Sequence, residues 1–489
     1  MAGLRHTLAS LHARTFGARA VARKHATPGL AQARILRELT TAFAATEFGR
    51  AQGIQASMSY DVFRRRVAPR GAEAFHPLLE RVRRGAADVL WPGTCTHFIR
   101  TAGTSTGRPR SVPWTDALAA HHRQAGLDAL LFLAERSPGI LRGPLHFLSR
   151  STATGTRPGF STSPLVAYPY ADDDFGTLAP AHLPAWLPSD PEATAPVVCT
   201  HPRRLLDLLL EREKKASRLT CAVIGGSPSL PWRNALAEAA GRTAIHEVYG
   251  TAEALVAVED GEREQGLRVL CATGVFFEFL PFADYEEGRL PHLGERALPL
   301  DAVQPGVDYI ILVTTPGGFC RCPLGDIVRF VTVAPHRFQV RGRADQRLNA
   351  LGEATGEAEL LAAITLVCRR RDWSLRHVHV APVVAHSLTG QQRGHHEWWV
   401  ELKPGSRETP TGPVLAEALD RELQVSSQAY TAARATGRLE PPVVRLVMPG
   451  VFSNWLQSAP NRRGTTPTCR GDRLVADALA EIARFSKDQ

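Results

Sequence analysis

The stretch that decides the fold is residues 219–253, which read LTCAVIGGSPSLPWRNALAEAAGRTAIHEVYGTAE. Leu219–Ile224 and Thr243–Tyr249 are short apolar runs, and Leu230–Ala240 between them has a helical composition that ends at Gly241. A strand, a helix and a strand at this spacing predict two parallel strands joined by a right-handed crossover. The sequence therefore predicts an α/β fold built around a parallel sheet.

The turns that follow these two strands are expected to lie at the same edge of the sheet. Gly225, Gly226 and Ser227 follow the first strand, and Gly250–Glu253 follows the second. Ligands of open α/β sheets bind outside the carboxyl ends of the strands. Both turns are therefore candidate parts of one ligand site.

The composition of the whole chain is that of a globular protein. It has 489 residues, of which 44% are hydrophobic and 22% are charged, which excludes a disordered or fibrous protein. Its longest apolar runs, such as Leu205–Leu210 and Ala129–Ala134, are much shorter than the roughly 18 residues that a membrane span needs. We therefore expect no transmembrane helix and no membrane partner.

The net charge of +10 raises the question of a nucleic-acid partner. The basic residues are scattered without a run of five like charges, and only five of the 58 are lysine. This distribution indicates that the positive charge reflects a general preference for arginine in the sequence. A surface that binds nucleic acid is the weaker alternative.

Cysteine usage and the N-terminus bear on the cellular compartment. The eight cysteines show no pairing pattern, and Cys320 and Cys322 lack the second half of a zinc site. There is no apolar signal segment, so we expect a reducing, cytoplasmic location. Residues 1–37 hold no acidic residue and several arginines, so a mitochondrial transit peptide is the alternative to an ordinary helical N-terminus.

The pattern along the chain predicts two domains. Residues 1–90 are expected to be mostly helical, with Leu30, Ile35, Leu39 and Phe43 near helical spacing. A segment rich in charge and glycine over 341–353 indicates a boundary, so we predict a large domain over 1–343 and a smaller one over 344–489. In the smaller domain we expect helices over Glu357–Arg369 and Pro413–Leu423 and strands over Val378–Val384, Glu397–Leu402 and Val443–Val447.

The first candidate for chemistry is the loop Thr101–Arg110, which reads TAGTSTGRPR. Its hydroxyls and glycine amides can surround phosphate oxygens, and Arg108 and Arg110 supply positive charge. The lysine of a Walker loop is absent, and a plain linker is the alternative.

Two acidic residues beside glycine turns are further candidates. Glu253 at the end of a strand can ligate Mg²⁺, which prefers oxygen ligands, and the alternative is a glutamate that caps a helix. Asp326 after Gly325 can accept hydrogen bonds from ribose hydroxyls, and the alternative is a hairpin turn. Arg343 and Asp345, beside Gly342, suit a hinge between domains or a charged linker.

The order of these motifs resembles that of adenylate-forming enzymes. A finer match resembles the plant auxin-conjugating acyl acid amido synthetases, the Gretchen Hagen family, and their bacterial relatives. The stretches that carry it are Thr46–Arg50, Thr101–Thr115, Phe277–Pro281 and Tyr309–Asp326, with Tyr430, Arg434, Arg445 and Gly450–Phe452 in the C-terminal part. Together they span about residues 30–470.

The resemblance implies a large adenylate-forming N-terminal domain with β-sheets and helices, and a smaller, mobile α+β C-terminal domain. It implies that the protein activates a carboxylic acid with ATP and Mg²⁺ as an acyl-AMP and transfers the acyl group to an amine or amino acid. We expect a monomer or a homodimer.

The candidate site residues follow from these motifs and this resemblance. Those for nucleotide binding are Thr101, Gly103, Thr104, Ser105, Thr106, Gly107, Gly226, Ser227, Tyr249, Gly250, Thr251, Asp326 and Arg343. The candidate catalytic residues are Glu253, Arg110 and Arg463, and Glu253 is also the candidate metal ligand. Phe276–Leu280 and residues 120–230 are expected to supply substrate walls.

The chain departs from the family pattern at two positions where the family has a lysine. Arg110 stands where the loop usually ends in lysine, and Thr465 stands where the family has a lysine that reaches the α-phosphate. Loss of a cation at a developing negative charge costs about 10²–10³ in rate, unless Arg462 or Arg463 substitutes. The alternatives are thus a protein with impaired adenylation that uses a preformed acyl donor or only binds a ligand, and an acyl-CoA ligase.

Overall fold

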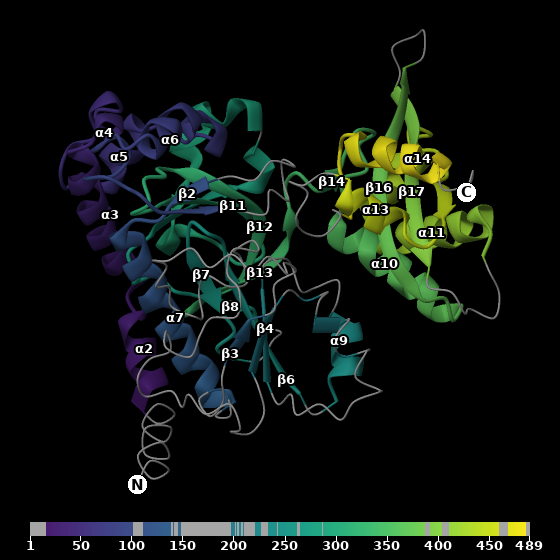
Figure 1. Ribbon diagram of the computed structural model, residues 1–489, viewed down its shortest axis with the longest axis horizontal. Coiled ribbons are helices and arrows are strands. Elements are labelled where there is room, and N and C mark those ends of the chain that lie inside the picture. The colour runs from purple at the N-terminus through teal and green to yellow at the C-terminus, as the bar shows by residue number, and fades with distance from the viewer. Residues whose placement is uncertain are drawn as a thin grey trace. The chain divides into compact units, whose positions relative to one another are not determined.

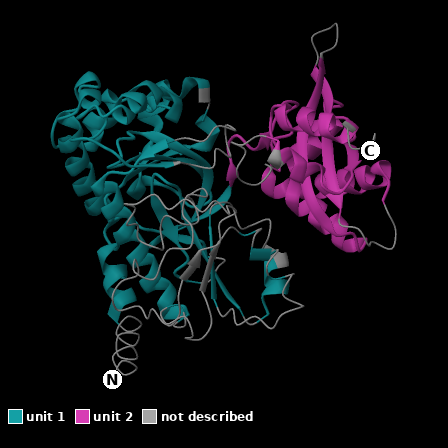
Figure 2. Cartoon of the chain, viewed as in Figure 1, with its two compact units in different colours: residues 1–102, 110–341 teal, residues 103–109, 342–489 magenta. Residues whose placement is uncertain are grey.

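The computed structural model describes residues 16–100, 111–137, 140, 145–147, 197–200, 202, 205–206, 209, 221–225, 233–241, 243–261, 265–285, 287–386, 392–402, 410–458 and 468–485 (Figure 1). The chain divides into two compact units (Figure 2). The first unit holds the described residues up to Arg341, and the second holds those from Gly342 onward.

The N-terminal part of the first unit is helical. The bounds of its helices are α2 (Ala18–Lys24), α3 (Pro28–Ala44), α4 (Glu47–Ala51), α5 (Tyr60–Arg66), α6 (His76–Arg83) and α7 (Asp116–Arg136). Helix α3 begins at Pro28, whose missing N–H is no loss in a first turn. It buries Ile35, Leu39 and Phe43, whereas Leu30 is 74% exposed. The predicted helix is therefore confirmed, but its apolar face does not include Leu30.

One sheet dominates the first unit. Its described strands are β3 (Leu145–Phe147), β4 (Val197–Thr200), β5 (Cys221–Ile224), β6 (Ala244–Gly250), β7 (Leu255–Val258), β8 (Leu267–Val269), β9 (Phe276–Pro281), β10 (Leu298–Pro299), β11 (Asp308–Thr314), β12 (Cys322–Val333) and β13 (His336–Arg343). These eleven strands lie in the order β10-β9-β11-β12-β13-β8-β7-β6-β5-β4-β3. Strands β3 to β6 are parallel, and the printed pairings among the others are antiparallel.

The strand, helix and strand predicted over residues 219–249 are confirmed. Strand β5 is followed by α9 (Arg233–Ala240) and then by β6, and β5 and β6 pair in parallel with Cys221 opposite Ala244. The carboxyl ends of both strands therefore lie at one edge of the sheet. Glu253 follows β6 at this edge.

A small antiparallel pair flanks residues 101–110 in the chain. Strands β1 (Phe98–Arg100) and β2 (Ser111–Pro113) pair with Arg100 opposite Ser111. The chain then enters α7, where the Thr115 side chain caps the helix by accepting from the N–H of Leu118.

The second unit has its own three-stranded sheet. Strands β16 (Leu375–His386) and β17 (Gln392–Leu402) are antiparallel, and β18 (Val443–Val447) is parallel to β17. The other elements are β14 (Arg347–Leu348), β15 (Thr355–Gly356), α10 (Glu357–Arg370), α11 (Gly412–Ser426), α12 (Gln428–Ala435), α13 (Val451–Gln457) and α14 (Leu474–Phe485). The helices and strands predicted here are confirmed with shifted ends. Helices α13 and α14 pack on the sheet face that carries Ala381 and Trp399.

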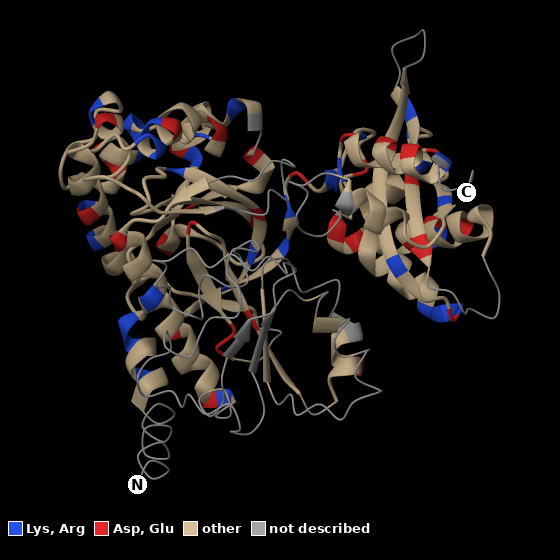
Figure 3. Cartoon of the chain, in the orientation of Figure 1, with Lys and Arg blue, Asp and Glu red and all other residues tan. Residues whose placement is uncertain are grey.

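Two surface properties complete the description. Among the described residues, no helix is both long and apolar enough to cross a lipid bilayer. Figure 3 shows basic and acidic residues interspersed on both units rather than separated by sign. The absence of a nucleic-acid partner stays a prediction.

Candidate functional site

The turn after β6 begins at Gly250, where the backbone leaves no room for a side chain. Thr251 N–H donates to Ala254 O at 2.7 Å, and Ala254 N–H donates back to Thr251 O at 3.2 Å. A Cβ on Gly250 would lie 2.7 Å from Ala254 O and 2.8 Å from Leu255 Cα. Contacts this close exclude any side chain, so the glycine is what allows β6 to turn directly into β7.

Glu253 lies in this turn. The residue is 6% exposed, and its N–H donates to Thr251 Oγ1 at 3.2 Å. Within the described part of the chain, its carboxylate has no hydrogen-bond or ion-pair partner. The next element is strand β7, so the alternative in which Glu253 caps a helix is excluded. A carboxylate with no partner among the described residues leaves its oxygens available to a divalent cation, which prefers oxygen ligands.

Tyr249, at the end of β6, contacts the second acidic candidate. Its hydroxyl donates to Asp326 Oδ2 at 2.8 Å, and both residues are buried. Its ring packs edge-on against Phe338 of β13, with the ring centroids 5.6 Å apart. The order of the sheet puts β7, β8 and β13 between β6 and β12. Strands lie about 4.8 Å apart, so a flat sheet would keep these side chains from meeting. The sheet therefore curls enough to bring them together.

Asp326 lies in an irregular part of β12. The pairing of β12 with β11 changes register between Ile310 and Leu312, so that Leu324, Gly325 and Asp326 form a bulge. Gly325 has a φ of 86°, a conformation that favours glycine. Bulges redirect side chains, and this one accompanies the contact of Asp326 with Tyr249. The simple hairpin turn that was the alternative for this motif does not describe it, because Asp326 lies inside the strand.

Helix α7 contacts the same turn through two buried histidines. His122 Nε2 is 3.1 Å from Ala252 O, and His121 Nε2 accepts from Leu255 N–H at 3.2 Å. Burial lowers the pKa of His121 to about 4, and burial also lowers the pKa of His122 well below its usual value. Both rings are therefore neutral near pH 7. Neither histidine was predicted as a site residue, and the only signal in the sequence was the pair of adjacent histidines in a predicted helix.

Other predicted site residues do not join this group. Arg343 belongs to the second unit, where its Nε donates to Asp345 Oδ1 at 3.1 Å. The residues that lie outside the described part of the chain are Thr101, Gly103, Thr104, Ser105, Thr106, Gly107, Arg110, Gly226, Ser227, Arg463 and Thr465. Their roles stay predictions. The structure brings together Tyr249, Gly250, Thr251, Glu253 and Asp326.

The segment Phe276–Leu280 was expected to supply substrate walls, but its apolar side chains are core residues. Phe276, Phe277, Phe279 and Leu280 are at most 2% exposed. Glu278 between them forms a buried ion pair with Arg321, with Arg321 Nη2 2.7 Å from Glu278 Oε1. This segment is therefore structural.

Family models match most of the chain. Models described as the GH3 family N-terminal, central and C-terminal domains match residues 19–227, 268–343 and 358–475. The chain belongs to the GH3 family. The predicted family resemblance is thus confirmed.

Relatives of the GH3 family match over different lengths. A mouse GH3 domain-containing protein is 33% identical over 195 residues, which cover 39% of this chain and 35% of the relative. A probable rice indole-3-acetic acid-amido synthetase, GH3.9, is 28% identical over 38% of this chain and 43% of the relative. A rice protein named as a probable indole-3-acetic acid-amido synthetase, GH3.2, is 21% identical over 91% of this chain and 88% of the relative. The alignments with the first two therefore span less than half of each relative.

Solved GH3 structures have the same fold. The GH3.15 acyl acid amido synthetase in complex with 2,4-DB superposes with a TM-score of 0.70 at 16% identity, covering 95% of each chain. A second GH3.15 structure gives 0.68 at 17% identity, covering 96% of this chain and 95% of the other. The predicted fold class, α/β with an N-terminal and a C-terminal part, is confirmed.

Proposed function

We propose that this GH3 chain is an ATP-dependent acyl acid amido synthetase. It would activate a carboxylic acid as an acyl-AMP and transfer the acyl group to an amine or amino acid. The observation that carries the proposal is the hydrogen bond from Tyr249 to Asp326, which unites two candidate nucleotide-binding residues beside Glu253. Relatives that are named indole-3-acetic acid-amido synthetases support this class of reaction.

Residues at and near the carboxyl end of β6 would bind different parts of ATP. Asp326, oriented by the Tyr249 hydroxyl, would accept hydrogen bonds from the ribose hydroxyls. Glu253 would hold Mg²⁺, and its unpartnered carboxylate fits that role. When bound, Mg²⁺ would offset the negative charge on the phosphates. The carboxylate of the acid would then attack the α-phosphorus and release pyrophosphate.

The remaining parts of the machinery are proposed from the sequence. The loop 101–110 would surround the phosphates, and Arg110 and Arg463 would supply positive charge to them. Residues 344–489 would form a lid that carries Arg463 to the nucleotide. In the second half-reaction, the amine would attack the acyl carbonyl of the acyl-AMP and release AMP.

The test is exchange of labelled pyrophosphate into ATP with a panel of carboxylic acids. We expect exchange that requires both an acid and Mg²⁺, because formation of the acyl-AMP is reversible. A protein that binds ATP but catalyses no exchange with any acid would contradict the proposal. A second panel, with amino acids, simple amines and coenzyme A as acceptors, distinguishes an amide synthetase from an acyl-CoA ligase.

One sequence observation favours a second candidate function. Thr465 occupies the position at which the resemblance expects a cationic lysine. A chain without that charge would form the acyl-AMP slowly and would use a preformed acyl donor instead. Amide formation from synthetic acyl-AMP, without any pyrophosphate exchange, would identify this candidate. The expected cytoplasmic location and the expected monomer or homodimer stay predictions.

A further inference from the structure

Helix α7 holds the turn that carries Glu253 at two points. His122 lies within hydrogen-bonding distance of Ala252 O, and His121 contacts Leu255 N–H on the other side of Glu253. Both histidines are at most 2% exposed. The two contacts therefore enclose the segment from Ala252 to Leu255.

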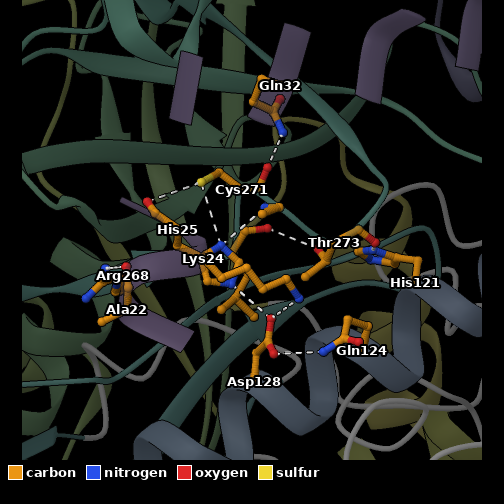
Figure 4. Close-up of polar contacts among 12 residues, drawn as sticks. Ala22, Lys24, His25, Gln32, His121, Gln124, Asp128, Arg268, Cys271 and Thr273 are labelled. Carbon is orange, nitrogen blue, oxygen red and sulfur yellow. Dashed lines mark hydrogen bonds and ion pairs between the residues drawn. The ribbon is translucent and has the colours of Figure 1, made fainter. Parts of the chain in front are cut away.

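The hydrogen-bond partners determine which nitrogen of each ring carries the proton. A carbonyl oxygen can only accept, so His122 carries its proton on Nε2 and donates it to Ala252 O. Leu255 N–H donates to His121 Nε2, so His121 carries its proton on Nδ1 and donates it to Thr273 O at 2.7 Å. Figure 4 shows His121 directed towards Thr273. His122 Nδ1 is buried without a partner, so the hydrogen bond of this ring is the one to Ala252.

The peptide group between Ala252 and Glu253 is held at both of its polar atoms. Its carbonyl oxygen accepts from His122, and its N–H donates to Thr251 Oγ1 at 3.2 Å. Since a peptide group is planar, fixing these two atoms fixes the direction in which the Cα of Glu253 leaves it. His122 therefore helps to hold the peptide group from which Glu253 departs.

Helix α7 is itself anchored, so His122 has a defined position. At its start, Thr115 Oγ1 donates to Pro316 O at 2.7 Å, and the ring of Trp114 stacks on His122 with centroids 4.8 Å apart. Further along, Asp128 accepts from Lys24 Nζ at 2.7 Å and contacts His25 Nε2 at 2.9 Å (Figure 4). Rigid elements of this kind place functional groups more accurately than loops do.

We propose that His122 is a positioning residue that sets the geometry of Glu253 for a divalent cation. The inference rests on the proposed function, because it assigns a role to a contact beside the candidate metal ligand. A merely structural histidine would satisfy the buried carbonyl of Ala252 and stabilise the fold, but its loss would leave cation affinity unchanged. Partners that orient metal ligands, by contrast, change metal affinity when they are removed.

The experiment measures Mn²⁺ binding by electron paramagnetic resonance in the presence of α,β-methylene-ATP, whose α,β linkage resists cleavage. His122→Leu removes the donor at similar size, and His122→Gln places an amide donor near the position of Nε2. Arg123→Ala, on the exposed side of the same helix, is the matched control. Glu253→Ala reports loss of the metal ligand itself.

We expect His122→Leu to weaken Mn²⁺ binding by about 10- to 100-fold, while its affinity for the metal-free nucleotide stays that of the wild type. His122→Gln should restore most of the Mn²⁺ affinity, and Arg123→Ala should not change it. If His122→Leu does not fold, His122→Asn replaces it, because its amide is too short to reach Ala252 O.

The outcomes separate the inference from the proposed function. Wild-type Mn²⁺ affinity in His122→Leu, with affinity lost in Glu253→Ala, overturns the inference and leaves the proposed function standing. Failure of His122→Gln to restore affinity also overturns it, because packing would then explain the effect. No binding of Mn²⁺ and nucleotide by the wild-type protein overturns both.

Discussion

At the scale of single residues, the proposed chemistry depends most on Glu253. Glu253 lies in a turn and its carboxylate has no partner within the described chain, whereas Asp326 is already oriented by Tyr249. A carboxylate that no protein group binds can accept a divalent cation, which prefers oxygen ligands. Glu253 is therefore the proposed ligand for the cation that accompanies the nucleotide.

The variant Glu253→Gln tests this assignment. It keeps the size of the side chain but removes the charge, so we expect the rate of pyrophosphate exchange to fall by about 10²–10³-fold. Raising the Mg²⁺ concentration should recover little of the rate. Glu295→Gln changes an exposed glutamate in the same unit and serves as the control. An unchanged rate in Glu253→Gln would remove Glu253 from the metal site.

At the scale of elements, several motifs that carry the family resemblance hold elements together. Glu278 on β9 forms a bidentate ion pair with Arg321, just before β12, through Nε at 2.9 Å and Nη2 at 2.7 Å. Arg321 is fully buried and also donates to Gly294 O at 2.7 Å. In the second unit, Tyr430 and Arg434 both bind Asp420. Residues that carry the family resemblance therefore include some that join structural elements as well as candidate ligand contacts.

The ion pair between Glu278 and Arg321 predicts a large effect on stability. Glu278→Gln leaves the Arg321 charge buried without its counter-charge, so we expect a loss of about 3–5 kcal/mol in unfolding free energy. Urea unfolding of the whole protein measures this change in the free energy of unfolding. The double variant Glu278→Leu with Arg321→Met should recover only part of the loss, because it removes both buried charges but leaves Gly294 O without its donor. A single variant as stable as the wild type would show that the pair contributes no stability.

The elements that the sequence predicted correctly are those with local signals. Strands β5 and β6 and helix α9 follow from short apolar runs bounded by glycine. The contact between Tyr249 and Asp326 could not follow from such signals, because it requires the curl of the sheet across β7, β8 and β13. The same reason explains why Phe276–Leu280 was misassigned: its burial depends on packing across the sheet rather than on its own sequence.

At the scale of the whole molecule, the GH3 family models match most of the chain, and both units contain predicted parts of the machinery. Tyr249, Glu253 and Asp326 belong to the first unit, and Arg343 belongs to the second. Family resemblance predicted the roles of residues in both units. It could not predict whether this chain, with Thr465, keeps full adenylation activity.

The variant Thr465→Lys tests the missing charge. If the absence of a cation limits formation of the acyl-AMP, this variant should raise the pyrophosphate exchange rate by about 10-fold or more. The rate of amide formation from synthetic acyl-AMP should not change, since that step follows the loss of pyrophosphate. An unchanged exchange rate would indicate that an arginine such as Arg463 already supplies the charge.

The most direct test of the central claim is a crystal structure of the protein with ATP and Mg²⁺. The account predicts a carboxylate oxygen of Glu253 about 2.0–2.1 Å from the ion and the ribose hydroxyls donating to Asp326. A nucleotide bound away from the turn at Gly250–Glu253, with neither carboxylate in contact with it or with the metal, would contradict the account.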